Sequence, residues 1–304
     1  MRALVQSGGG KKGAFHLGVL DVLIGEQGRE YDYMAGVSVG ALNTGMLAQF
    51  PEGELEQGLR ALAAVWEDLG GTSSVWKHWF LHQLAGVWKD SFYDSSPLAA
   101  LVAKHFDQEK LKASGRVVRF GAVAYGSGNY YEATEKDEDL GKWILASAAF
   151  PGFLTPMKIA GDLWVDGGAR RVTPLKGAID YGCNEIDVIL SGPRKTVPKS
   201  LSDNFLGTKR SALTISLRAL EVLMDEIFER DVKVAEVYNE AIRSGGAGDK
   251  RLIRLNVYEP LEPFPGDSLT FDPVEIAEMR AAGREVARDR PSALPGPPRA
   301  PTIP

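Results

Sequence analysis

A serine flanked by two glycines is the first feature of the chain that could do chemistry. Gly36-Val37-Ser38-Val39-Gly40 fits the pattern G-x-S-x-G and stands between an expected strand and an expected helix. In a nucleophile elbow the serine occupies a strained turn, and glycines two residues away leave room for it. The amides of a helix that begins at Val39 favour negative charge beside the hydroxyl. Because so short a pattern also recurs by chance, Ser38 needs support from other motifs.

A glycine-rich loop near the start of the sequence offers backbone amides to an anion. Gly8-Gly9-Gly10-Lys11-Lys12-Gly13 lies between an expected strand and an expected helix, which suits either a phosphate or an oxyanion. The letters also satisfy G-x-G-x-x-G, and Asp32 follows at the distance that a dinucleotide-binding protein uses. However, Asp32 begins the second strand, and the serine motif occupies that strand's end. We therefore favour an oxyanion hole, with a dinucleotide-binding (Rossmann-type) oxidoreductase as the alternative.

An acidic motif is the best candidate partner for the serine. A triad of the α/β-hydrolase type has the order serine, acid, histidine, and no histidine follows Asp166. Asp166-Gly167-Gly168 comes after the apolar Leu163-Trp164-Val165, and its glycines let backbone and substrate approach closely. A histidine before Asp166 could in principle serve, and an Asp-Gly turn between strands is the structural alternative. The histidines, which we expect to be solvated or structural, are His16, His78, His82 and His105.

These motifs require a sheet whose strands end where the loops begin. The start of the sequence alternates strand, glycine loop, helix, strand, sharp turn and helix, as in βαβ units. We predict a three-layer αβα fold of the α/β class, with a mostly parallel central sheet buried on both faces. The predicted strands cover residues 2–6, 31–37, 116–124, 185–190 and 252–257, and the predicted helices cover 14–24, 41–48, 209–244 and 273–288.

Three motifs in this order make the chain resemble a known family. The motifs are a glycine-rich loop with a basic residue, Lys12, before its last glycine, a G-x-S-x-G elbow, and a D-G-G acid motif further on. Together they are similar to those of the patatin-like phospholipase family, and the sequence looks like a bacterial member. Residues 146–151, ASAAFP, are similar to the family's segment between elbow and acid. The resemblance predicts one patatin-like domain over residues 1–290, followed by a proline-rich disordered tail over 291–304.

The resemblance implies a lipid acyl hydrolase with a serine–aspartate dyad. Ser38 is the expected nucleophile and Asp166 the expected base, provided that burial makes Asp166 more basic. The expected substrates are carboxylic esters of phospholipids, lysophospholipids or neutral glycerides, cleaved without calcium or another cofactor. The expected oxyanion hole consists of Gly8, Gly9, Gly10 and Val39, and the other motif positions are Lys12, Gly13, Gly36, Gly40, Gly167 and Gly168.

The composition argues against several other classes of protein. A net charge of −5 over 304 residues gives no electrostatic footprint for nucleic acid. The lone Cys183 excludes an intrachain disulfide, and no D-x-D-x-D-G loop indicates a calcium site. No apolar run could span a bilayer, and no cleavable signal opens the sequence. We expect a cytoplasmic protein, with attachment to a membrane surface or export without a cleaved signal as alternatives.

Residues 75–93 form the stretch best suited to a lipid surface. Several apolar residues share one face at helical spacing: Trp76, Phe80, Leu84, Val87 and Trp88. A helix of this kind can lie in a membrane interface or cap an acyl pocket, and it can equally pack in the core. A lipid or membrane surface is the expected partner, and the sequence leaves the oligomeric state open. A non-catalytic lipid-binding protein on the same fold is a third hypothesis, against which the intact Ser38 and Asp166 argue.

Overall fold

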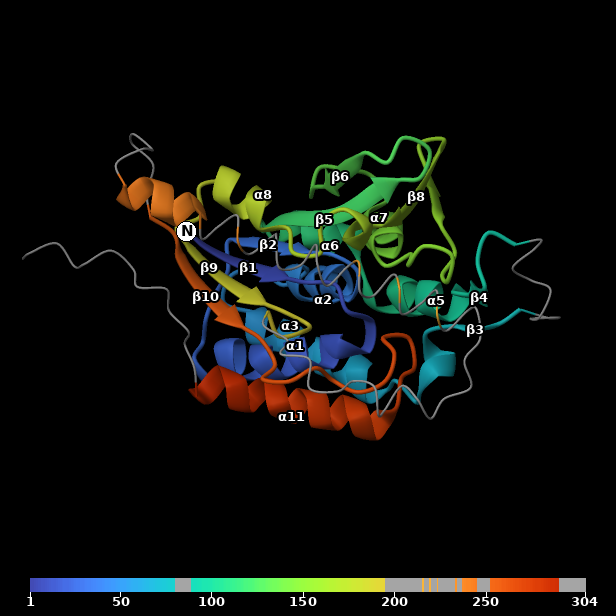
Figure 1. Cartoon of the computed structure of the whole chain (residues 1–304), viewed down its shortest axis with the longest axis horizontal. Helices are drawn as coiled ribbons and strands as arrows, with labels where there is room; N and C mark the ends of the chain where they lie inside the picture. The colour runs from blue at the N-terminus through green and yellow to red at the C-terminus, as the bar shows by residue number, and fades with distance from the viewer. Residues whose placement is uncertain are drawn as a thin grey trace, which may run out of the picture.

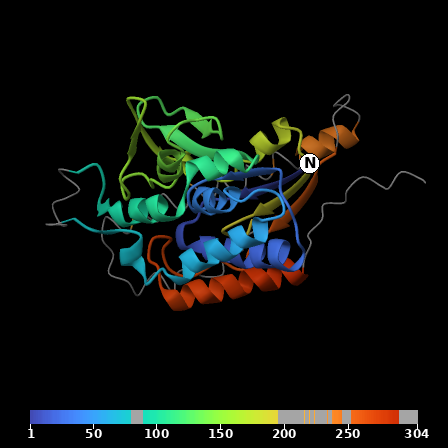
Figure 2. The same cartoon turned by 180° about the vertical axis from the view of Figure 1, so that it is seen from behind.

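The computed structural model describes residues 1–79, 89–194, 237–244 and 252–289, together with the single positions 215, 219, 223 and 233. Figure 1 shows a central sheet with helices on both of its faces, and Figure 2 shows the same arrangement from behind. The predicted three-layer α/β fold with a mostly parallel sheet is therefore confirmed.

The central sheet has eight strands, of which seven follow the order β10-β9-β1-β2-β5-β8-β7. Neighbours from β10 to β5 are parallel, β6 and β8 run antiparallel to β5, and β7 runs antiparallel to β8. The strands are β1 (Arg2–Gln6), β2 (Tyr33–Gly36), β5 (Val117–Ala124), β6 (Tyr130–Ala133), β7 (Met157–Ile159), β8 (Asp162–Asp166), β9 (Glu185–Ile189) and β10 (Arg254–Tyr258).

Each face of the sheet has its own apolar cluster, because successive strand residues point to opposite sides. Leu4 and Met34 pack on one face with α1, α2, α3 and α11, whereas Ala3, Val5 and Ala35 pack on the other with α8. The helices are α1 (Gly13–Leu20), α2 (Val39–Ala48), α3 (Leu55–Glu67), α5 (Ser96–His105), α6 (Gln108–Ala113), α7 (Leu140–Ser147), α8 (Leu175–Asp180) and α11 (Pro273–Asp289); a π-helical turn, Asp21–Glu26, extends α1.

The prediction of an amphipathic helix over residues 75–93 is wrong at both ends of that stretch, where the chain forms short strands instead. Lys77–His78 form the short strand β3, which pairs antiparallel with β4 (Tyr93–Asp94). Trp76 stacks on Tyr93 with ring centroids 3.8 Å apart, and its indole N–H donates to the Leu269 carbonyl oxygen at 2.8 Å. These tertiary contacts override the helical spacing, while residues 80–88 lie outside the described ranges.

Two other predictions fall largely outside the described residues. Of the long helix predicted over 209–244, residues 237–243 are helical, and the tail 291–304 is not described. In the part of the chain that is described, no helix is long and apolar enough to cross a membrane.

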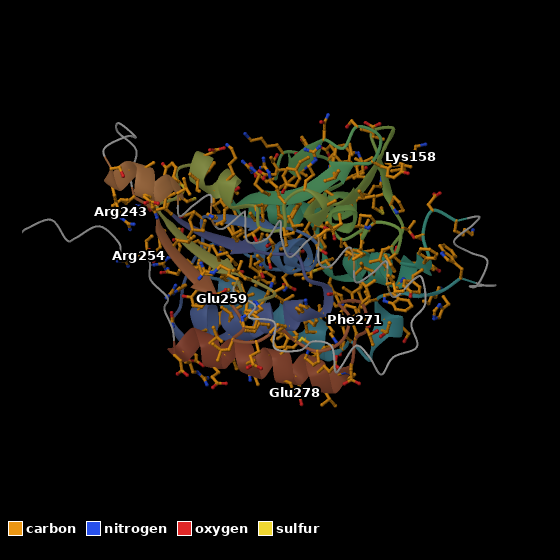
Figure 3. The ribbon with its side chains drawn as sticks, in the orientation of Figure 1. Lys158, Arg243, Arg254, Glu259, Phe271 and Glu278 are labelled. Atoms are coloured by element: carbon orange, nitrogen blue, oxygen red, sulfur yellow. The ribbon has the colours of Figure 1, made fainter. Side chains whose placement is uncertain are left out.

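The carboxyl ends of the parallel strands define one edge of the sheet. Figure 3 labels Arg254, the first residue of β10, and Glu259, which follows its last, so the strand direction can be followed between them. The glycine loop follows β1 and Ser38 follows β2, so both lie at the carboxyl edge. This is the edge at which open α/β sheets bind ligands.

Candidate active site

Ser38 occupies a strained turn between β2 and α2. Its φ of 57° and ψ of −127° lie in a region that residues other than glycine seldom adopt. A Cβ on Gly36 would lie 2.2 Å from the Gly40 carbonyl oxygen, and one on Gly40 would lie 2.3 Å from that of Gln6. The strand, turn and helix expected around Ser38 are therefore all present, and crowding explains the two glycines.

A second serine, Ser147, accepts a hydrogen bond from the backbone of this turn. The Ser38 amide donates to the Ser147 hydroxyl oxygen at 3.0 Å, in a fully buried contact. Two residues further on, the Ala149 carbonyl oxygen accepts from the Asp166 amide at 2.9 Å. One segment thus fixes the backbone of both Ser38 and Asp166. The sequence singled out this segment by resemblance alone and gave Ser147 no role.

Asp166 ends β8, and its side chain is fully buried. Burial raises the pKa of its carboxyl to about 7, although the Ser38 hydroxyl and the Gly168 amide both act to lower that pKa. Oδ1 accepts from the Gly168 amide at 2.7 Å, whereas Oδ2 has no hydrogen-bond partner among the described residues. The Ser38 hydroxyl is thus close enough to affect the carboxyl without making a well-formed hydrogen bond. Such a carboxyl can take up and release a proton near neutral pH.

Strand β5 explains how Ser38 and Asp166 come together. Amides of successive residues in a strand point to opposite edges, so those of residues 117 and 125, an even number apart, point to the same edge. The Val117 amide donates to the Asp32 carbonyl oxygen just before β2, and the Tyr125 amide donates to the Leu163 carbonyl oxygen in β8. Strands β2 and β8 therefore lie along the same edge of β5, one beside each half of it.

The two strands approach each other from opposite directions. Gly36, the last residue of β2, pairs with Phe120, and Asp166, the last residue of β8, pairs with Ala122. Only two strand residues, about 7 Å, separate these positions along β5. The ends of β2 and β8 meet at this point, which places the turn that carries Ser38 beside Asp166.

The glycine loop packs directly against this turn. A Cβ on Gly8 would lie 3.3 Å from the Cβ of Ser38, and a Cβ on Gly13 would lie 2.3 Å from a methyl carbon of Val39. Side chains at these two positions would push the loop away from Ser38. The glycines are therefore needed for close approach.

Three backbone amides at this junction have no hydrogen-bond partner among the described residues. Gly9, Gly10 and Val39 have no hydrogen-bond acceptor in the part of the chain that the structure describes. The Gly8 amide instead donates to the Val172 carbonyl oxygen at 3.1 Å. Gly8 was expected among the donors of the oxyanion hole, but its amide supports the loop in this structure.

The two lysines of the loop differ in their surroundings. Lys11 is fully buried, and its ammonium pairs with the Glu275 carboxylate of α11 at 2.5 Å. Its amide donates to the Ser268 carbonyl oxygen at 2.9 Å. Lys12, the residue that the sequence analysis selected, is only partly buried. Sequence reasoning missed Lys11 and Glu275 because they are 264 residues apart and no local pattern links them.

The position of Asp32 argues against the dinucleotide-binding alternative. Its carboxylate accepts from the Arg2 amide at 2.9 Å, at the amino end of β1. The glycine loop lies at the opposite end of that strand. In a dinucleotide-binding fold the ribose-binding acid stands at the carboxyl end of its strand, next to the loop.

The histidines have other surroundings. His16 Nε2 lies 2.9 Å from the Ser191 hydroxyl oxygen, His78 lies against the rings of Trp76 and Tyr93, and His105 ends α5. His82 is outside the described ranges. Among the described residues it is Asp166 that interacts with the Ser38 hydroxyl. Within the same ranges, no three His, Cys, Asp or Glu side chains gather as a set of metal ligands.

At the carboxyl edge of an α/β sheet, the fold thus brings together a strained serine, a buried carboxyl and a glycine loop with amides that lack an acceptor among the described residues. A family model described as patatin-like phospholipase matches residues 4–179, more than half of the sequence. The chain belongs to the patatin-like phospholipase family. This membership supports lipid acyl hydrolysis as its general activity.

A curated protein and a solved structure are similar to the chain. Lysophospholipase NTE1 from Candida glabrata is 26% identical over 194 residues, a match that covers 60% of this chain and 10% of that protein. The chain therefore spans about a tenth of the curated relative that it matches. The crystal structure of VipD from Legionella pneumophila aligns with a TM-score of 0.46 and 12% identity, over 94% of this chain and 66% of that one.

Proposed function

We propose that this chain hydrolyses carboxylic ester bonds of phospholipids, lysophospholipids or neutral glycerides through Ser38 and Asp166. The observation that carries the proposal is the buried Asp166 carboxyl beside the Ser38 hydroxyl, with a pKa raised to about 7 by burial. Membership of the patatin-like phospholipase family supports a lipid substrate. Lysophospholipase NTE1 as a relative supports lysophospholipids among the esters to be tried first.

In the first half of the reaction, the Ser38 hydroxyl oxygen attacks the acyl carbonyl carbon and Asp166 accepts the hydroxyl proton. The carbonyl oxygen becomes an oxyanion, which accepts hydrogen bonds from the amides of Gly9, Gly10 and Val39. The intermediate then collapses, the bond to the alcohol oxygen breaks, and the alcohol takes the proton back from Asp166. The acyl group remains on Ser38.

In the second half, a water molecule replaces the alcohol. Asp166 accepts a proton from this water as its oxygen attacks the acyl carbon, and the same amides bind the second oxyanion. Collapse returns the proton to Ser38 and releases the carboxylic acid. Every proton is thus moved by Asp166, so the mechanism requires neither a histidine nor a metal ion.

The substrate's physical state bears on where the chain works. We propose that it acts at a lipid or membrane surface as a cytoplasmic protein that attaches peripherally, and that nucleic acid is not a partner. The exposed side chains of Phe92 and Leu261, among the described residues, are apolar groups that such a surface can accept. Sedimentation with phosphatidylcholine vesicles measures this attachment directly.

The test of the proposed function is Ser38→Ala. This change deletes one oxygen, so ester hydrolysis should fall to background while the folded structure persists. Labelling by a fluorophosphonate should disappear with it, and labelling that persists on the variant would remove Ser38 from the role. Profiling wild type on p-nitrophenyl esters of increasing acyl length, and on phosphatidylcholine and its lyso form, then defines the substrate.

A further inference from the structure

A buried chain of hydrogen bonds lies behind the glycine loop, and the proposed mechanism does not use it. It consists of Ser7, His16 and Ser191, which are 0%, 0% and 5% exposed. Ser7 follows β1, Ser191 follows β9, and His16 belongs to α1. Three elements that are far apart in the sequence thus contribute polar side chains to one buried place beside the loop.

The contacts of this chain of hydrogen bonds lead into the loop. The Ser191 amide donates to the Ser7 hydroxyl oxygen at 2.9 Å. The Ser7 hydroxyl is within donating distance of the Gly8 carbonyl oxygen at 3.1 Å and of the Ser191 hydroxyl oxygen at 3.2 Å. At the other end, His16 Nε2 lies 2.9 Å from the Ser191 hydroxyl oxygen. The Ser191 side chain is therefore fixed from two sides.

Ser191 in turn supports Gly9. A Cβ on Gly9 would lie 2.2 Å from the Ser191 hydroxyl oxygen and 2.3 Å from its Cβ, so the backbone of Gly9 rests directly on this side chain. The φ of Gly9 is 154°, a value that side chains rarely allow. The amides of Gly9 and Gly10 have no acceptor among the described residues, so displacement of Ser191 changes the direction in which these free amides point.

His16 is a costly residue to place in the core. Its Nδ1 atom has no hydrogen-bond partner among the described residues, and a buried polar atom without a partner destabilises a fold. Burial lowers the pKa of its imidazole to about 3, so the ring is neutral throughout the range in which esterases work. An apolar side chain would fill the same volume without this cost, so its hydrogen bond to Ser191 is what distinguishes histidine here.

We propose that His16 and Ser191 are positioning residues, which hold the backbone of Gly9 and Gly10 so that their amides meet the oxyanion formed at Ser38. The inference rests on the proposed function. Neither side chain touches the substrate, since Ser191 lies behind Gly9 and His16 lies behind Ser191. Their loss should therefore impair stabilisation of the oxyanion and leave binding of the ester almost unchanged.

A pair of substrates reports on the oxyanion directly. In a thionoester, sulfur replaces the carbonyl oxygen, and sulfur is a weak hydrogen-bond acceptor. Amides that stabilise an oxyanion therefore accelerate the oxygen ester much more than the thionoester. The ratio of the two kcat values falls when these amides move, whereas a loss of folded enzyme lowers both kcat values equally.

The first variant is Ser191→Ala, with Tyr31→Phe as its matched control. Each change deletes one buried hydroxyl. Tyr31, however, precedes β2 at the amino end of the sheet, and its hydroxyl donates to the Asp187 carboxylate at 2.8 Å. For Ser191→Ala we expect kcat on the oxygen ester to fall on the order of 10- to 100-fold, below the loss seen when an oxyanion donor is deleted outright. KM and thionoester turnover should change by less than about threefold. Tyr31→Phe should leave the ratio at its wild-type value.

The second test exploits the geometry of His16. The hydrogen bond is made by Nε2, which the side-chain amide of Gln can replace, whereas the shorter Asn cannot reach Ser191. His16→Gln should retain most of the oxygen-ester to thionoester ratio, and His16→Asn should lose it. Rescue by Gln and not by Asn indicates a specific hydrogen bond, because both variants place an amide in the same core.

The results separate the two proposals. If Ser38→Ala retains turnover, the proposed function fails whatever the other variants do. If Ser38→Ala is inactive but Ser191→Ala keeps the wild-type ratio, or loses both activities equally, the positioning role is wrong and the dyad stands. Equal ratios in His16→Gln and His16→Asn would likewise overturn the role of His16.

Discussion

Two buried aspartates of the same sheet have opposite surroundings. Asp166 and Asp187 are both 0% exposed. Asp187, in the middle of β9, accepts from the Arg29 guanidinium on both oxygens at 2.8 Å, from the Tyr31 hydroxyl at 2.8 Å and from the Asn256 amide at 2.7 Å. Its charge is balanced and each oxygen has donors, as the interior of a protein requires.

Asp166 lacks almost all of this support. One backbone amide donates to Oδ1, whereas among the described residues Oδ2 has no hydrogen-bond partner and the carboxyl forms no ion pair. The pKa raised to about 7 follows from burial without compensation. The comparison teaches that a buried carboxylate that serves the fold is fully paired, whereas one kept short of partners retains a proton to exchange.

The largest expected effect is on turnover. Asp166→Asn should lower kcat on a short-chain ester by about 10² to 10⁴, because an amide of the same shape cannot accept the Ser38 proton. Asp187→Asn should stay within about twofold of wild type per folded molecule. Rates are measured on purified variants after gel filtration. An Asp166→Asn enzyme near wild type, or a variant of His78, His82 or His105 as inactive as Ser38→Ala, would contradict the dyad.

The same two substitutions should change stability in opposite directions. At pH 8 the buried Asp166 is ionised at a cost that Asn does not have, so Asp166→Asn should raise the free energy of unfolding by up to about 4 kcal/mol. Asp187→Asn leaves the Arg29 guanidinium without its charge partner and should lower that free energy by about 3 kcal/mol. Urea unfolding followed by circular dichroism measures both. Destabilisation by Asp166→Asn would mean that its carboxylate serves the fold after all.

The pH dependence sharpens the contrast further. Asp166 must be ionised to act as a base, so kcat/KM should rise with pH through a midpoint near 7. The free energy of unfolding should change in the opposite direction. The stabilising contribution of Asp166 to it is fully present below the unfolded pKa near 4 and is lost as pH rises through about 7. Asp166→Asn should remove this slope. A flat kcat/KM profile between pH 5 and 8 would mean that Asp166 is not the base.

The smallest expected effect tests whether the unpaired oxygen of Asp166 serves a proton or a cation. If it serves a proton, excess EDTA should change ester turnover by less than about twofold. The control is the same assay with EDTA and excess calcium. Loss of activity with EDTA that calcium restores would assign this oxygen to a metal ion instead.

Sequence patterns predicted the parallel strands β1, β2, β5, β9 and β10 because their signals are local, but they did not predict the antiparallel strands β6, β7 and β8. The runs of apolar residues in β1, β5 and β9 and the glycines after β1 and β2 lie within a few residues of what they specify. The errors at strand ends are small: the strand predicted over 31–37 covers Tyr33–Gly36. The helix predicted at residue 75 fails because Trp76 stacks on Tyr93, which is a contact that periodicity does not contain.

The candidate site was predicted less completely, for a physical reason. The motifs indicated Ser38 and Asp166, but their meeting depends on β2 and β8 sharing one edge of β5, and strand pairing is not written in either motif. Likewise, the partners of Ser147 and Ser191 are distant in the sequence: Ser147 accepts from the Ser38 amide, and Ser191 contacts Ser7 and His16. No spacing pattern therefore marks either serine.

The contacts of Lys11 give the protein an order of assembly. Ribosomes make the glycine loop and Ser38 first, yet Ser268 and Glu275, which hold Lys11, are made on the order of tens of seconds later at typical rates of translation. Until then the Lys11 ammonium lacks the counter-charge beside which it is buried, and the Lys11 amide lacks its acceptor. A nascent or prematurely terminated chain therefore carries the glycine loop and Ser38 without the contacts that hold Lys11, which are complete only once α11 has docked.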